Sequence, residues 1–167
     1  GGTYSEEAFA IALEHNLALI GVSDVHNLID WDYEPHNGGH RPVTLVLAES
    51  DSIDGIREAL FARRTIVWFK NLLLGREPSL SSLIDASIQV VAANYLPATN
   101  VLRVEIQNSS DAAFILQNLT DMTFMGSHDT IELTANDRTI LQVKPGADRS
   151  EVTLKFAVLN ALTAPRA

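Results

Sequence analysis

The sequence predicts an α+β protein made of two units: a partial α/β unit in residues 1–85 and an all-β sandwich in residues 86–167. Continuous apolar runs alternate with helical patterns in the first half. In the second half, single apolar residues alternate with polar ones, which is the period of a strand with one buried face. Residues 71–85, which contain Gly75 and Pro78, are the expected connection between the two units.

A helix followed by a strand is predicted near the N-terminus. Ser5 can cap the helix and Asn16 can end it, and the residues expected to be buried are Phe9, Ala12 and Leu13. The continuous apolar run from Leu17 to Val22 is typical of a strand covered on both faces. A long loop rich in Asp, His and Gly then occupies residues 23–41.

Beyond this loop, the sequence predicts a strand, a helix and another strand. The strands are expected at Val43 to Ala48 and at Thr65 to Phe69. Asp51 or Ser52 can cap the intervening helix, whose apolar residues at helical spacing are Ile53, Ile56 and Leu60. A strand, crossover helix and strand of these lengths indicate a βαβ arrangement with a parallel sheet.

The second half is predicted to be a β-sandwich, because it contains several short alternating strands and no convincing helix. Asn136-Asp137 lies between two strand patterns and indicates a hairpin turn. Residues that share the apolar face of these strands are expected to be buried against one another: Leu102, Val104, Ile106, Ile131, Leu133, Val152, Leu154 and Phe156.

Charge and composition exclude some classes of partner. The net charge is −9, and acidic residues outnumber basic ones by 12 to 6 in residues 1–84 and by 9 to 6 in residues 85–167. Such a surface repels a polyanion, so nucleic acid is not an expected partner. No apolar run is long enough to span a membrane. The chain begins with neither a basic region nor an apolar signal core, and its composition suits a soluble protein of either the cytoplasm or the exported compartments.

The absence of cysteine restricts the chemistry of any metal site to His and carboxylate ligands. Asp24 and His26 are the strongest candidates, because they directly follow an apolar strand pattern, where α/β folds place their ligands. Two residues apart on an extended chain, they can reach one metal cluster. The alternative is that the two residues have no functional role, with Asp24 capping a turn and His26 solvated, since an Asp-x-His triplet arises easily by chance.

The rest of the loop strengthens the functional interpretation. Several charged and imidazole groups follow within it: Asp30, Asp32, Glu34, His36 and His40. Gly38 and Gly39 come just before His40, Arg41 and Pro42, and two glycines let the backbone approach a ligand closely. The alternative is a solvated acidic loop that tolerates histidines.

Several runs together resemble the C-terminal stretch of phosphoesterases of the PHP (polymerase and histidinol phosphatase) family, and within it the branch of Sb-PDE-type phosphodiesterases. These runs are Gly21-Val-Ser-Asp24-Val-His26, Gly39-His40-Arg41-Pro42-Val-Thr-Leu-Val, Ile56-Arg-Glu-Ala-Leu60 and Arg64-Thr-Ile-Val-Trp68-Phe-Lys70. The resemblance covers roughly residues 4–85. The all-β tail resembles the immunoglobulin-like domain that often follows in this branch.

The resemblance implies that the first unit is a fragment of a distorted β/α barrel that binds two or three divalent ions, usually zinc, manganese or iron. Asp24 and His26 match the last metal-binding motif of the family. The resemblance also implies the hydrolysis of a small phosphorylated substrate, a phosphate mono- or diester, for which the bound ions would supply activated water. His40 and Arg41 are expected to contact the phosphate, since a guanidinium fork suits its oxygens.

The chain departs from the family in lacking the His-x-His pair and the further Glu and His ligands that begin the metal site. A catalytic metal normally takes at least three protein ligands, so we expect this chain alone to be inactive and to bind no metal tightly. The alternative function is a non-catalytic β-sandwich binding or spacer module attached to a degenerate α/β remnant. An incomplete barrel also leaves a free edge, expected at Leu17 to Val22, which could pair with a second copy of the chain.

Overall fold

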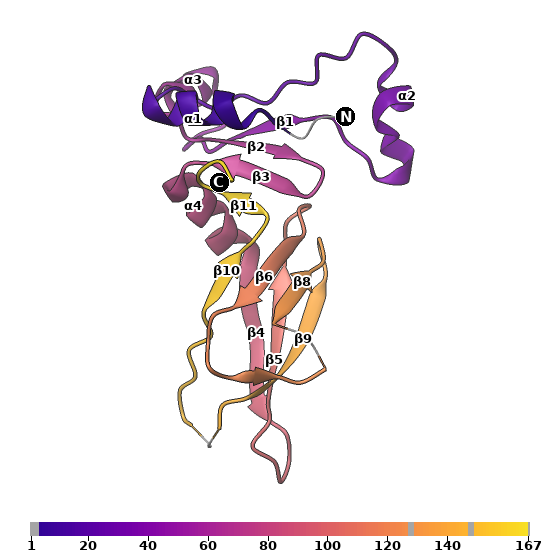
Figure 1. The fold of residues 1–167 in the computed structure, drawn as a ribbon, viewed down its shortest axis with the longest axis vertical. Helices are drawn as coiled ribbons and strands as arrows, with labels where there is room; N and C mark the ends of the chain where they lie inside the picture. Colours follow the sequence, from indigo (N-terminus) through magenta and orange to yellow (C-terminus); the bar gives the residue numbers. More distant parts are fainter. Residues whose placement is uncertain (1–3, 127–128, 147–148, 167) are drawn as a thin grey trace. The chain divides into compact units, whose positions relative to one another are not determined.

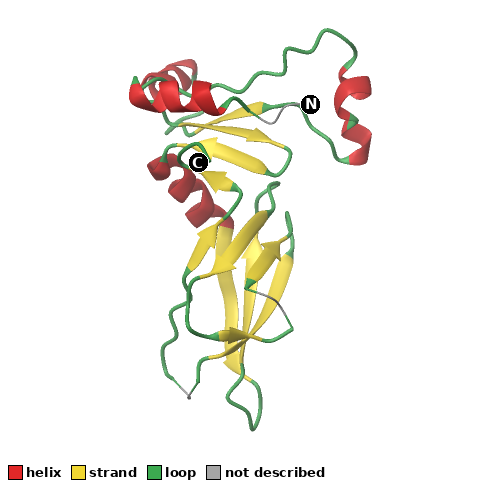
Figure 2. Ribbon diagram, in the orientation of Figure 1, coloured by secondary structure: helices red, strands yellow, loops and turns green. Residues whose placement is uncertain are grey.

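The computed structural model describes residues 4–126, 129–146 and 149–166. The chain divides into two compact units, Gly1–Ser82 with Ala161–Ala167 and Leu83–Asn160 (Figure 1). Both units contain strands, and the helices belong to the first unit except for the end of α4 (Glu77–Ser87) (Figure 2). The α+β class predicted from the sequence is confirmed.

The first unit contains four strands in one sheet, in the order β1-β2-β3-β11. Its helices and strands are α1 (Glu6–Glu14), α2 (Ile29–Tyr33), the 3₁₀ helix η1 (Pro35–Asn37), β1 (Val43–Val46), α3 (Ile53–Phe61), β2 (Thr65–Phe69), β3 (Leu72–Gly75), α4 (Glu77–Ser87, which continues into the second unit) and β11 (Ala161–Leu162). The strand β11 pairs in parallel with β3, so the last residues of the chain return to the first unit.

The helix caps follow the sequence prediction closely. The Ser5 hydroxyl accepts a hydrogen bond from the Ala8 amide, and Asn16 ends the region in the left-handed conformation at φ 55°. Ser52, rather than Asp51, caps α3 through the Gly55 amide. The predicted apolar face of α3 is not buried, however: Ile53 is 78 % exposed, and the buried residue of the helix is Ala59.

The predicted parallel sheet is wrong. β1 and β2 run antiparallel, with Val46 opposite Thr65. After α3 the chain re-enters the sheet beside the end of β1, where Arg64 donates from Nε to the Leu47 carbonyl. Arg64 also pairs with Glu58, and this hydrogen bond raises the pKa of Arg64.

The strand predicted at Leu17 to Val22 is also absent from the described structure. This segment is held to β1 by a side chain, because the Gly21 amide donates to Thr44 Oγ1 at 2.9 Å. Arg76 donates a hydrogen bond from Nη2 to the Leu17 carbonyl. Ile20 and Val22 are 60 % and 74 % exposed, so the described residues leave most of these apolar side chains uncovered. The free strand edge expected here for a second copy is therefore not formed by these residues.

The second unit consists of two antiparallel sheets, as expected for a sandwich-like β domain. One sheet has the order β4-β5-β9-β7 and the other β10-β6-β8. The strands are β4 (Ile88–Tyr95), β5 (Leu102–Asn108), β6 (Phe114–Asn118), β7 (Thr123–Phe124), β8 (Thr130–Leu133), β9 (Arg138–Lys144) and β10 (Phe156–Val158). Asn136, at φ 53°, does lie in a turn, but it connects β8 to β9 in the other sheet rather than closing a hairpin.

Five of the eight predicted core residues of this unit are buried: Leu102, Val104, Ile106, Ile131 and Leu133. The largest fully buried side chain is Phe114 of β6, which lies opposite Leu133 of β8. Val152, Leu154 and Phe156 are only half-buried. Their alternation is regular, but only Phe156 lies in a strand.

Two Asn-x-Ser/Thr sequences build the same turn in the second unit. Asn108 donates through Nδ2 to the Ala112 carbonyl, and Asn118 donates to Met122, each four residues ahead. In each turn the amide oxygen accepts from the backbone and hydroxyl two residues on, at Ser110 and Thr120. These sequences match a glycosylation pattern, but Asn108 is 1 % exposed and its amide is committed to the fold.

Candidate functional site

The loop of residues 23–41 is anchored to the sheet of the first unit by Tyr33. Its hydroxyl donates to the Ser23 carbonyl at 3.2 Å, and its ring meets Phe69 of β2 edge-on, with 6.1 Å between the ring centroids. Gly39 packs so closely on this part of the loop that a Cβ atom there would lie 1.9 Å from the Tyr33 carbonyl oxygen. The glycine expected to admit a ligand thus serves the packing of the loop on itself.

Asp24 and His26 lie side by side. Asp24 Oδ1 and His26 Nε2 are 3.6 Å apart, and the two side chains are 91 % and 84 % exposed. Asp24 has a φ of 49°, a left-handed conformation that is uncommon outside glycine and that Asp tolerates better than most residues. Backbone strain of this kind is concentrated at functional sites.

The pair lines a pocket of about 710 Å³ together with His40 and Lys70. The wall also includes Asp32, Tyr33, Gly39 and Phe69. The structure therefore brings together three of the four residues singled out in the sequence. Arg41 is exposed and lines a different, neighbouring hollow with Ser23 and Thr44.

His40 is held by the backbone on both sides of its ring. Nδ1 lies 2.8 Å from the Arg41 carbonyl oxygen, and Nε2 lies 3.3 Å from that of Lys70. The ring also packs against Trp68 in a tilted arrangement, with 4.2 Å between the ring centroids and 40° between the ring planes. Because both ring nitrogens already face carbonyl oxygens, His40 is better placed to fix the Lys70 turn than to bind a ligand.

Lys70 is the pocket residue that the sequence did not single out. It occupies the turn between β2 and β3 at φ 54°, and its carbonyl accepts a hydrogen bond from Trp68 Nε1 at 2.8 Å. Its ammonium lies 5.3 Å from the Phe69 ring centroid and forms no ion pair with a described residue. In the sequence, Lys70 is only a single basic residue at the end of a predicted strand. Such residues are common, so this feature is weak evidence for a binding site.

The carboxylate of Asp24 and the imidazole of His26 are chemically suited to a divalent ion, but they supply only two ligands. Two ligands of one tetrahedral zinc ion, each about 2.1 Å from the metal, lie roughly 3.4 Å apart, close to the observed separation of the Asp24 and His26 donor atoms. Within residues 4–126, 129–146 and 149–166, no group of three or more His, Asp or Glu side chains is arranged to hold a metal. The pair thus fits as part of a ligand set.

None of the helices in the described ranges is both long and apolar enough to cross a membrane.

No curated protein sequence matches the chain. A family model described as an Ig-like domain matches residues 88–167, in agreement with the sandwich-like second unit.

A crystal structure from Bacteroides vulgatus matches almost the whole chain. That protein is described as a two-domain protein containing a predicted PHP-like metal-dependent phosphoesterase. The TM-score is 0.83 and the sequence identity 30 %, over 99 % of this chain and 48 % of that one. The chain thus spans about half the length of that protein. The comparisons thus confirm a resemblance to a protein that contains a predicted PHP-like phosphoesterase and, over residues 88–167, to an Ig-like domain, while the Sb-PDE-type branch stays a prediction.

Proposed function

We propose that the first unit is the C-terminal portion of a PHP-type β/α barrel, and that it contributes Asp24 and His26 to the metal site of a phosphoesterase. The observation that carries this proposal is the pairing of these two side chains at 3.6 Å in an open pocket. The similarity to a protein containing a predicted PHP-like phosphoesterase supports it. The motifs around Asp24 and His40 favour the Sb-PDE-type branch within that family.

In this proposal, each pocket residue has its own task. Asp24 and His26 hold a divalent zinc, manganese or iron ion through a carboxylate oxygen and an imidazole nitrogen. A bound divalent ion supplies activation of water and neutralisation of phosphate charge. Lys70 binds a phosphate oxygen of a small mono- or diester as a mobile point charge. His40 is a positioning residue, because it fixes the carbonyl of Lys70.

Two ligands are too few for a catalytic metal, so the remaining ligands must come from outside this chain. The chain covers 48 % of the similar protein, which leaves about half of that length to supply them. The uncovered apolar side chains of Ile20 and Val22 agree with a missing neighbour on this side. The net charge of −9 favours a small substrate over nucleic acid.

The isolated chain should bind Zn²⁺ weakly, with a dissociation constant on the order of 0.1–1 mM, because two protein ligands leave most of the coordination to water. Asp24→Asn and His26→Ala should each weaken binding at least tenfold in a competition assay with a chelating dye. His36→Ala is the matched control, since His36 belongs to the same loop but does not line the pocket. Equal losses in all three variants would contradict the assignment.

Phosphate binding distinguishes Lys70 from Arg41. In the presence of saturating Zn²⁺, Lys70→Gln should weaken the binding of inorganic phosphate about three- to tenfold, the effect of one exposed charge-assisted hydrogen bond. Arg41→Gln should change it less than twofold, because Arg41 lines another hollow. Phosphorus NMR line widths measure both affinities. A larger loss of phosphate affinity in Arg41→Gln than in Lys70→Gln would contradict this and assign the phosphate contact to Arg41.

A further inference from the structure

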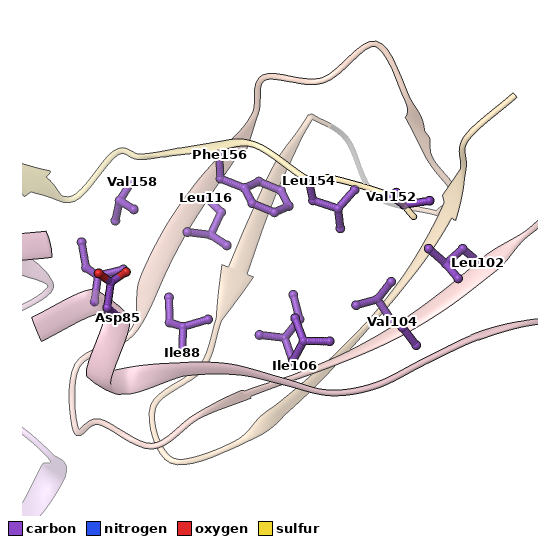
Figure 3. A pocket seen from close by; sticks show the side chains of 13 residues that line it. Asp85, Ile88, Leu102, Val104, Ile106, Leu116, Val152, Leu154, Phe156 and Val158 are labelled. Carbon is purple, nitrogen blue, oxygen red and sulfur yellow. The ribbon is translucent and has the colours of Figure 1, made fainter. Parts of the chain in front are cut away.

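The second unit contains an apolar pocket of about 420 Å³ between its two sheets (Figure 3). Such a volume lies within the range of small-molecule sites, about 300–1,000 Å³. Its floor is buried and apolar, and Figure 3 shows Val104, Ile106 and Leu116 facing the pocket, each 3 % exposed. Its walls are half-buried or exposed, as at Phe156 and Val90.

The pocket exists because one side of the sandwich is not closed. β4 and β10 are the edge strands of their sheets, and they are not hydrogen-bonded to each other. A bulge between Val90 and Ala92 interrupts β4, and the small side chain of Ala93 leaves room in the wall.

The opposite wall is an extended segment rather than a strand. It is fixed at one end where Tyr95 Oη contacts the Arg149 amide and carbonyl, and at the other where the Leu119 amide donates to the Lys155 carbonyl. Between these points, Val152 and Leu154 point into the pocket (Figure 3). The two attachments hold both ends of the segment that forms this wall.

One charged side chain lines this otherwise apolar surface. Asp85 of α4 lies at one end of the pocket, beside Val158 and Ile88 (Figure 3). Its carboxylate makes no hydrogen bond or ion pair to any described residue. An unpaired carboxylate next to apolar surface favours a cationic group, and the net charge of −9 disfavours an anionic ligand.

We propose that this pocket binds a single-chain amphiphile with a cationic head group, such as an alkylammonium. The apolar chain lies between the sheets over Val104, Ile106 and Leu116, and the ammonium pairs with Asp85. The burial of the chain supplies most of the affinity, since the removal of apolar surface from water is favourable. Asp85 supplies the selectivity for the head group. This site is independent of the metal pair in the first unit, and it gives the second unit a binding function.

Decylamine, decanol and decanoate share one chain length and differ in their head groups, so they test both parts of the proposal. Titrated into the full chain below their micelle concentrations, decylamine should bind most tightly and decanoate least. Amide and methyl shifts should center on Val104, Leu116 and Phe156. Asp85→Asn should weaken decylamine about fivefold, the effect of one partly exposed ion pair, and leave decanol unchanged. Asp121→Asn is the matched control, since Asp121 is exposed in the same unit and does not line the pocket.

A filling variant tests the location. Ala93→Phe should abolish the binding of decylamine, whereas Asn94→Phe, at an exposed neighbour that does not line the pocket, should not. If Ala93→Phe does not fold, Val152→Phe fills the pocket from the opposite wall. Shifts confined to the first unit, equal affinity for decanoate, or unchanged binding in the filled variants would overturn the proposal. Self-association that Ala93→Phe prevents would instead identify a second copy as the occupant and overturn it too.

Discussion

Phe114→Ala is expected to destabilise the second unit by about 3–5 kcal/mol, the usual cost of removing a buried phenyl ring. Phe114 is 0 % exposed and lies opposite the equally buried Leu133 in the β6–β8 ladder, so its loss leaves a cavity that the paired strands cannot easily collapse. Small domains are stable by only about 5–15 kcal/mol in total, and a single such change removes a large part of it.

Urea unfolding, monitored by resonances of the second unit, measures this effect. Ile140→Ala is the control, because Ile140 lies in β9 of the same unit but is 52 % exposed. We expect that control to cost less than about 1 kcal/mol. A loss below about 1.5 kcal/mol for Phe114→Ala would show that the ring is not part of the core, since buried Phe→Ala changes cost more.

Asn108→Ala is expected to cost about 2–4 kcal/mol, because it leaves several buried polar groups without partners. The Asn108 amide nitrogen donates to the carbonyls of Ala112, Leu133 and Thr134, and its oxygen accepts from the amide and hydroxyl of Ser110. The side chain therefore joins the end of β5 to the end of β8. Its removal affects both sheets of the second unit.

Asn118→Ala provides the comparison within the same chain. Asn118 builds the same turn with Met122 and Thr120, but it is only half-buried, so water can replace part of its hydrogen bonding. We expect it to cost less than half as much as Asn108→Ala. Equal losses measured by thermal unfolding would show that turn geometry, rather than burial, determines the contribution of these asparagines.

Local signals were predictable from the sequence because they depend on neighbouring residues. The Ser5 and Ser52 caps each join a side chain to a backbone amide three residues on, and Asn16 adopts its left-handed conformation at the end of the same helical segment. The alternation around Val104 and Leu133 placed the core of the second unit for the same reason. A short repeating pattern fixes which face of a strand is buried.

The direction of strand pairing was not predictable in this way. β1, α3 and β2 have lengths compatible with either a parallel crossover or a return beside the same strand end, and the choice depends on contacts such as Arg64 to the Leu47 carbonyl. The return of β11 to β3 depends on residues about 90 positions apart. Likewise, Lys70 enters the pocket only because β2 and β3 form a hairpin beside the loop of Asp24.

The assignment of Asp24 and His26 to a metal site is the central claim, and paramagnetic broadening by Mn²⁺ tests it most directly. Substoichiometric Mn²⁺ added to the isotope-labelled chain should broaden the resonances of Asp24, Val25 and His26 first, with those of His40 and Lys70 next, because these residues line one pocket. The effect should disappear in His26→Ala. Broadening centred instead on Asp30 and Glu34, or unchanged in His26→Ala, would contradict the assignment.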